Sequence, residues 1–330
     1  MKKIILFVVL CYWLANANIE AQPWPWPGEG TELEPFQISS LQCWEQLRDS
    51  VLHSPNNQIG VPGNWSYGKF FELTQDITDT IKFVIGGNHY AHSTNIAFEG
   101  NFDGKGHKMT LGIQNARGAL FSRVSGVTIK NLTTDGWVSG SMYAASLIAN
   151  CNNFLIIHQT GIMWNSIINC VNLATITGGV MAGGFAADVY RTNFISCINA
   201  GTINGQLSGG IVACLASSDT MLIKNCHNIG NVFSGTNGQG AGGIVGLHGA
   251  SRNVVGQIID CNNSGFVCGG LNTGGIVGVI LDNSNTIISN CINTGVVIGN
   301  GNVGCITGDG CIRPLIEDCY WDKQTCPHDD

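Results

Sequence analysis

The chain has 330 residues and a formal charge of −7, and only 11% of its residues are charged, whereas glycine alone accounts for 45. This length suits one elongated domain with a buried core. Because no basic patch is present, nucleic acid is excluded as an expected partner.

The N-terminus has the parts of a secretory signal. Met1, Lys2 and Lys3 form a basic start, and residues 4–14 form an apolar stretch that is too short to span a bilayer. Small-residue cleavage sites follow near Ala17 and Ala21. The sequence therefore predicts a signal peptide over residues 1–21 and a secreted or cell-surface protein. A membrane anchor is the alternative, and no later stretch is apolar enough to span a membrane.

A cap is expected at the start of the mature chain. Residues 22–36 are a Pro/Trp-rich linker and lead-in, and residues 37–97 should hold the cap and the first strands. Apolar residues recur at helical spacing from Leu41 to Leu52, after Ser39 as a helix N-cap. This pattern predicts a short helix that closes the N-terminal end of the core.

Between residues 98 and 326 the sequence repeats I-x-[NDS]-C-x-N-x-G-x-[VI]-x-G, then a variable loop, then G-G-I-V-G, and residues 327–330 form a tail. The repeated cysteine recurs after 27, 29, 35, 30 and 28 residues. Such periods indicate stacked units that cannot bury their apolar side alone. Short β-branched runs between glycines favour strands over helix. The sequence therefore predicts an all-β, right-handed parallel β-helix with three-strand coils of about 30 residues.

The apolar positions also predict a corner within each coil. Ile258 and Cys261 should both face inward although they are three residues apart, so the chain must bend at Asp260. Asp and Asn tolerate the left-handed backbone that a sharp corner needs. Stacking then predicts a structural ladder of buried thiols and side-chain amides at Cys170, Cys197, Cys226, Cys261, Cys291, Cys319, Asn199, Asn228, Asn263 and Asn293.

Cysteine pairing is expected only near the C-terminus. Without Cys11 the mature chain keeps 13 cysteines, an odd number that excludes complete internal pairing. Ladder thiols with parallel Cβ vectors have poor disulfide geometry. The irregular cysteines are the better candidates, and their spacing does not fit a zinc site, so no metal and no cofactor are expected. These candidates are Cys305, Cys311, Cys319 and Cys326.

The repeats resemble GLUG-motif repeats, which are found in bacterial surface proteins, adhesins and the non-catalytic parts of some IgA proteases. Phe98–His107 (FEGNFDGKGH) looks like the opening segment of that family. Gly118–Phe121 (GALF) with Val127–Leu132 (VTIKNL), and Cys319–Asp322 (CYWD), look like its later segments. The resemblance covers about residues 28–322 and implies a non-catalytic role in adhesion or recognition.

A carbohydrate-active β-helix enzyme is the alternative function. It would need paired carboxylates, or a carboxylate–metal cluster with a basic residue, on one face. In the repeats Asp188, Asp219 and Asp282 offer only a loose acidic row, without matching Lys or Arg. His89 and His92 have no evident partner carboxylate. A structural stalk or spacer is the third possibility.

One outer face becomes apolar toward the C-terminus. We expect Phe233, Phe266, Val296 and Ile298 to form an exposed stripe, with Trp137 on the same face further toward the N-terminus. Such patches mark a partner or a covering segment. The expected partner is a host or matrix protein or a glycan, and the alternative is that the tail with Tyr320 and Trp321 folds over the stripe.

Overall fold

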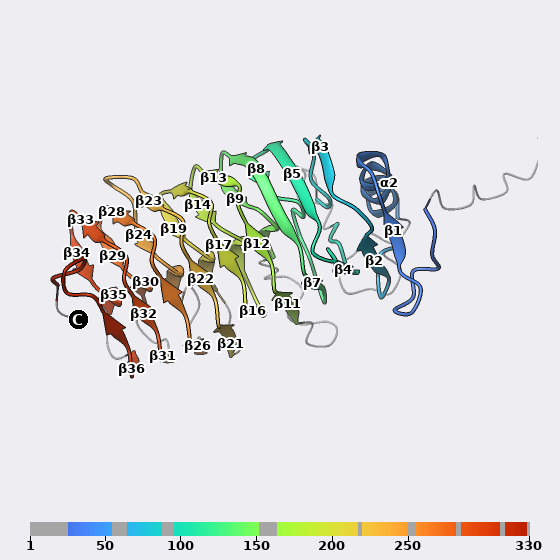
Figure 1. Cartoon of the computed structure of the whole chain (residues 1–330). Coiled ribbons are helices and arrows are strands. Elements are labelled where there is room, and N and C mark those ends of the chain that lie inside the picture. Colours follow the sequence, from blue (N-terminus) through green and yellow to red (C-terminus); the bar gives the residue numbers. More distant parts are fainter. Residues whose placement is uncertain are drawn as a thin grey trace, which may run out of the picture.

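The computed structural model describes residues 26–54, 65–87, 96–151, 164–216, 220–249, 255–281, 285–310 and 314–328. Every strand pair within these ranges is parallel, and the strands stack into one elongated solenoid (Figure 1). The expectation of an all-β parallel β-helix is therefore confirmed. The predicted signal peptide, residues 1–21, lies outside the described residues.

The longest uninterrupted stack is a ten-stranded sheet, called here the long sheet, which runs the length of the molecule. Its first two strands lie before residue 98, where the first strands were expected together with the cap. In stacking order the strands are β1 (Phe36–Ile38), β2 (Phe70–Leu73), β4 (Asn101–Asp103), β7 (Thr128–Lys130), β11 (Asn165–Ile168), β16 (Thr192–Ile195), β21 (Met221–Lys224), β26 (Val255–Ile259), β31 (Asn285–Ser289) and β36 (Leu315–Glu317).

A second sheet of fourteen strands starts with three long strands and then divides into two rows. The starting strands are β3 (Ile77–Ile81), β5 (Lys108–Gln114) and β8 (Thr133–Gly140). The first row is β12 (Val171–Asn172), β17 (Ile198–Asn199), β22 (His227–Asn228), β27 (Asn262–Asn263), β32 (Ile292–Asn293) and β37 (Tyr320–Trp321). The second row is β13 (Thr175–Gly178), β18 (Ile203–Gly205), β23 (Val232–Ser234), β28 (Val267–Gly269) and β33 (Val297–Gly299).

Two smaller sheets complete the coils. The seven-stranded sheet contains β6 (Arg117–Gly118), β9 (Tyr143–Ala145), β14 (Met181–Gly183), β19 (Leu207–Gly209), β24 (Gly240–Gly242), β29 (Asn272–Gly274) and β34 (Asn302–Gly304). The six-stranded sheet contains β10 (Ile148–Asn150), β15 (Ala186–Val189), β20 (Val212–Leu215), β25 (Val245–His248), β30 (Val277–Ile280) and β35 (Thr307–Gly310).

Each full repeat coil thus has five short strands, and the expected number of three was wrong. In the coil that begins with β26, Asp260 has a φ of 56° and separates β26 from β27. Residues 264–266 separate β27 from β28, and Gly275 with Ile276 separates β29 from β30. Each of these interruptions contains a turn residue of the repeat motif, so one long strand becomes two short ones.

The corner predicted from the apolar parity is confirmed at every copy. The residue before the repeated cysteine lies in the left-handed region, with φ between 51° and 56° at Asn169, Ser196, Asn225, Asp260, Asn290 and Asp318. The side chains on either side then both reach the core, since Ile258 and Cys261 are at most 1% exposed.

We predict that Asn290→Val lowers the free energy of unfolding by about 1–2 kcal/mol, because a β-branched residue is strained in the left-handed region. Asn290 is exposed with a φ of 53°, so its side chain is not part of the core. Chemical denaturation checks this value. Asn290→Gly is the control and should retain stability, whereas equal losses in both variants would contradict the strain argument.

The N-terminal end is closed by α2 (Leu41–Leu52), which buries Trp44, Leu47 and Val51. The Trp44 indole packs edge-on against Phe102 and Phe121 of the first coils, at centroid distances of 5.6 and 5.5 Å. The N-cap is Ser40 rather than Ser39. Ser40 has extended backbone, and its side chain accepts a hydrogen bond from the backbone N–H of Cys43.

The C-terminal end is closed by the tail. A disulfide joins Cys305 and Cys326, two of the four cysteines expected to pair, while Cys319 is half-buried outside this bond and Cys311 lies outside the described residues. The tail does not fold over the predicted stripe, because Tyr320 and Trp321 instead pair with Ile292 and Asn293 as the next rung. Stacking satisfies the backbone of these two residues more fully than a side contact would.

Candidate functional site

A groove of about 690 Å³ lies on the outer face of the long sheet at its N-terminal end. Its floor is formed by the outward side chains of β1, β2, β4 and β7, and the loop before β1 forms one wall. The lining residues are Gly28, Glu32, Leu33, Glu34, Pro35, Gln37, Phe70, Phe71, Glu72, Asn101, Phe102, Asp103, Lys105, Thr128 and Lys130.

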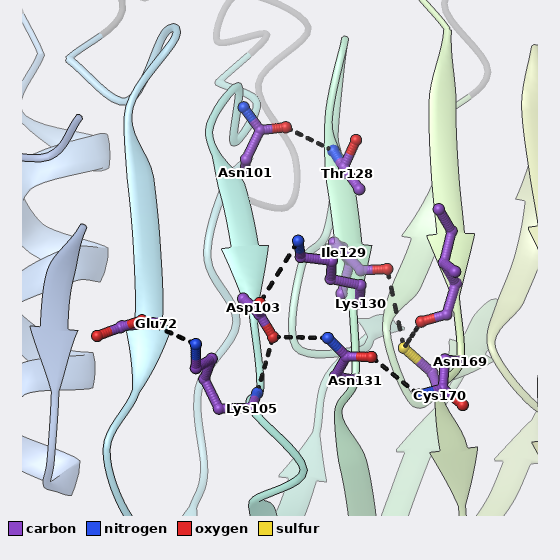
Figure 2. A network of polar contacts seen from close by, with 11 residues as sticks. Glu72, Asn101, Asp103, Lys105, Thr128, Ile129, Lys130, Asn131, Asn169 and Cys170 are labelled. Carbon is purple, nitrogen blue, oxygen red and sulfur yellow. Dashed lines mark hydrogen bonds and ion pairs between the residues drawn. The ribbon is translucent and has the colours of Figure 1, made fainter. Parts of the chain in front are cut away.

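The strand register brings charged residues from distant segments together on this floor. Glu72 pairs in register with Asp103, and Asp103 pairs with Lys130. The Lys105 ammonium lies 3.7 Å from a carboxylate oxygen of Glu72, and the Lys130 ammonium lies 3.5 Å from one of Asp103 (Figure 2). Two carboxylates and two ammonium groups thus alternate across three rungs.

Asp103 is the centre of the polar network in Figure 2. Its Oδ1 accepts hydrogen bonds from the Asn131 side chain and from the backbone N–H of Lys105, both at 2.9 Å. Burial opposes ionisation of Asp103, but these hydrogen bonds and the charge of Lys130 outweigh it and lower the pKa of the carboxyl. Asp103 therefore stays ionised and fixed in place.

A second row of groove residues is neutral and polar. Asn101 lies one position before the inward Phe102, and its side-chain oxygen accepts the backbone N–H of Thr128 at 3.0 Å. Asn101 and Thr128 are both half-buried. This row continues beyond the groove through Ser166, which pairs in register with Thr128. The groove is therefore walled at its N-terminal end and continuous with the sheet face toward the C-terminus.

The sequence prediction did not include these groove residues, although the sequence carries a signal for them. Phe71-Glu72, Phe102-Asp103 and Ile129-Lys130 each place a charged residue directly after an inward apolar one. Since adjacent strand residues face opposite sides, these three charges must lie on the outer face.

Four of the five residues predicted for the apolar face lie next to one another on the surface. Val296 and Ile298 are 39% and 47% exposed, and Phe233 and Phe266 are half-buried with ring centroids 5.8 Å apart. Phe233 pairs in register with Cys268, and Cys268 pairs with Ile298. These four apolar residues therefore form one surface over three successive coils.

Trp137 does not join the stripe. It is 46% exposed and pairs in register with Gly112 of the preceding coil and Thr175 of the following one. The polar residues Thr202 and Asn231 continue the outward positions of the next coils before Phe266 is reached. Trp137 is therefore a separate exposed aromatic residue near the N-terminal third of the sheet.

The asparagines predicted to stack form a continuous amide ladder, and none of them is exposed. Each Nδ2 donates to the Oδ1 of the next asparagine at 2.7–2.8 Å, from Asn172 through Asn199, Asn228 and Asn263 to Asn293. The same Nδ2 also donates to the carbonyl two residues later, as in Asn228 to Gly230 at 2.9 Å. Asn172 was missed, although it follows Cys170 at the repeat spacing.

The thiols of the repeated cysteines also stack. Five of the six are buried, and Cys319 at the end is half-exposed. Their thiols donate to carbonyls of the preceding coil, as in Cys291 to Ile258 at 3.4 Å. Burial raises the pKa of the Cys170 and Cys226 thiols well above the ordinary value. For Cys197 and Cys261, burial is outweighed by hydrogen bonds from neighbouring ladder thiols, which lower the pKa. The ladder thiols are thus held by one another and by backbone carbonyls, which is a structural role.

The acidic row considered for catalysis is not supported by the register. Asp188 is 5% exposed, pairs in register with Asn150 and Cys214, and accepts a hydrogen bond from the Asn150 side chain at 3.1 Å. Asp219 and Asp282, like His89 and His92, lie outside the described residues. The described part of the chain contains no cluster of three His, Cys, Asp or Glu residues placed to hold a metal ion. No helix in that part is long and apolar enough to cross a membrane.

Neither a protein-family model nor a curated protein sequence matches the chain. Among solved structures, it is similar to the crystal structure of a candidate immunoglobulin A1 protease from Bacteroides ovatus, with a TM-score of 0.65. The two are 18% identical, and the match covers 89% of this chain and 86% of the other. At this identity the likeness establishes a shared fold and nothing about activity.

Proposed function

We propose that this chain is a secreted or cell-surface protein that recognises a protein or glycan without transforming it. The groove on the long sheet carries the proposal. Its charged side chains are held by ion pairs on neighbouring rungs, so little side-chain freedom is lost when a ligand binds. A preformed concave site with a few fixed polar groups is the usual form of a binding site.

The state of the carboxylates favours binding over glycoside hydrolysis. A general acid needs a raised pKa so that it carries a proton at neutral pH, whereas the pKa of Asp103 is lowered. Asp103 also already accepts two hydrogen bonds and an ion pair. The carbohydrate-active enzyme remains the alternative, because Glu72 and Asp103 are adjacent carboxylates with lysines beside them.

Several features support an extracellular location. The Cys305–Cys326 disulfide suits an oxidising compartment. The ladder thiols are mostly buried and thus protected from oxidation there. We also propose, from the motifs in the sequence, that the repeats are of the GLUG kind.

The proposal is tested by screening residues 22–330 against immobilised glycans and host or matrix proteins, with product analysis of every glycan that binds. Binding that leaves the ligand chemically unchanged supports recognition. Cleavage of a bound oligosaccharide would favour the enzyme, and a complete absence of binding would favour a stalk or spacer.

We expect the stripe to be a second contact surface, for a protein or glycan partner. The double substitution Phe233→Ser and Phe266→Ser should abolish binding of a partner that uses the stripe, because it removes the exposed apolar area there. Surface plasmon resonance measures the loss, and thermal melting shows whether the fold is retained. Thr177→Ala with Thr202→Ala, on the same face toward the N-terminus, is the matched control. Unchanged binding of every partner by the serine variant would reject the stripe.

A further inference from the structure

We propose that the groove binds an uncharged or amino-bearing saccharide chain, laid along the solenoid axis across β2, β4 and β7, and that it rejects acidic polysaccharides. This inference rests on the recognition function proposed above and names the ligand class of that site. It follows from the shape, the chemistry and the charge of the groove.

The shape favours a chain that lies across the strands. The groove spans four rungs spaced ~4.8 Å apart, so it extends roughly 14 Å along the axis. The wall formed by Glu32, Leu33 and Glu34 closes one end, and the sheet face beyond Thr128 is open. Because β2, β4 and β7 are each paired on both edges, a peptide cannot bind here by adding a strand.

The chemistry matches sugar hydroxyl groups, each of which both donates and accepts hydrogen bonds. The groove alternates acceptors and donors within a short span, with the Glu72 carboxylate beside the Lys105 ammonium. The Asn101 side-chain oxygen is held by the Thr128 backbone, and no contact within the described residues engages its NH₂ group, which can donate to a ligand. Phe70 is half-buried at the edge of the floor and offers an apolar face to the C–H groups of a sugar ring.

The charge of the groove selects against acidic chains. Glu32, Glu34, Glu72 and Asp103 supply four negative charges, and Lys105 and Lys130 supply two positive ones, so the lining carries a formal charge of −2. Both lysines are already paired with carboxylates at 3.7 and 3.5 Å. A carboxylated or sulfated saccharide would meet the negative charge of Glu32 and Glu34 at the wall, whereas an amino sugar would be attracted to it.

The test uses residues 22–330 and fluorescent hexasaccharides in a polarisation assay. Hexamers of glucose, mannose and N-acetylglucosamine serve as neutral probes, hexaglucosamine as the cationic probe and hexagalacturonate as the anionic probe. At least one neutral or cationic probe should bind, and the anionic probe should not. Preferred binding of hexagalacturonate overturns the proposal.

A groove-filling variant localises the binding. Thr128→Trp places a large side chain on the groove floor and should weaken the bound probe about tenfold or more. The control is Gln257→Trp. Gln257 is a half-buried residue on the outer face of the long sheet, on β26 and far from the groove. Retained affinity in Thr128→Trp, with thermal melting unchanged, overturns the groove as the site. The wider recognition function would then survive, because the probe still binds elsewhere.

A charge variant tests the selectivity. Glu32→Lys with Glu34→Lys changes two exposed wall residues and shifts the lining from −2 to +2. We expect hexaglucosamine to bind about tenfold more weakly and hexagalacturonate to gain affinity. Unchanged preference between these two probes contradicts the charge argument. Failure of all probes and all host proteins to bind rejects both this inference and the recognition function.

Discussion

Replacing Asn228 with Ala is expected to lower the free energy of unfolding by about 3 kcal/mol. Asn228 is fully buried in the middle of the amide ladder. It accepts a hydrogen bond from Asn199 and donates one to Asn263, both at 2.7 Å. The substitution would leave a donor on one coil and an acceptor on the next without these partners inside the buried core. Each buried polar group left unsatisfied costs about 1–3 kcal/mol.

The loss should be larger than at a surface asparagine because the ladder is a connected chain of polarised amides. Gly210 and Gly243 belong to glycine pairs on other strands, and a Cβ on either would clash with a ladder amide, that of Asn228 and Asn263 respectively. The two most regular parts of the repeat motif therefore contact each other across the narrow core. A cavity at Asn228 would disturb both.

Urea denaturation followed by far-UV circular dichroism measures the loss for Asn228→Ala. Ser264→Ala is the matched control, since Ser264 is exposed and directly follows the next ladder asparagine. We expect the control to change the free energy of unfolding by less than about 0.5 kcal/mol. If both variants lost the same small amount, the ladder would not stabilise the fold.

The ladders and corners could be predicted from the sequence because they depend on local spacing repeated many times. An asparagine follows the repeated cysteine by two residues in successive coils, as Asn263 follows Cys261, so aligning one pair of coils aligns the next. The left-handed residue at Asp260 follows from a step of three between two inward positions. One repeat of about 30 residues therefore contains the whole pattern from which the ladders and the corner are predicted.

The groove could not be predicted in the same way. Glu72, Asp103 and Lys130 lie in segments without the repeated cysteine, and only the register of β2, β4 and β7 brings them together. The loop wall at Glu32 to Glu34 has no periodic partner at all. The number of strands in a coil was also missed, because apolar periodicity does not show that a two-residue segment such as Asn262–Asn263 pairs as a separate strand.

The sequence also did not predict that His248, a titratable residue at the end of β25, is buried, because its contacts come from a distant segment. Its ring is fully buried, its Nδ1 lies 2.7 Å from the Thr286 hydroxyl, and a Cβ on Gly256 would clash with its Nε2. Burial lowers the pKa of His248 from 6.5 to about 4. The folded protein therefore holds the neutral ring, while the unfolded chain protonates it near pH 6.5.

We expect His248 to make the fold sensitive to acid. Because the folded pKa is below the unfolded one, its contribution is complete above pH 6.5 and is lost as the pH falls from 6.5 to 4. At 1.36 kcal/mol for each pKa unit, the loss is about 3 kcal/mol. His248→Asn, which can still bond Thr286, should lose about 3 kcal/mol less than the native chain between pH 7 and pH 4 in urea titrations. His227→Asn, on an outer face, is the control and should retain the full acid loss; equal slopes in the native chain and His248→Asn would refute the argument.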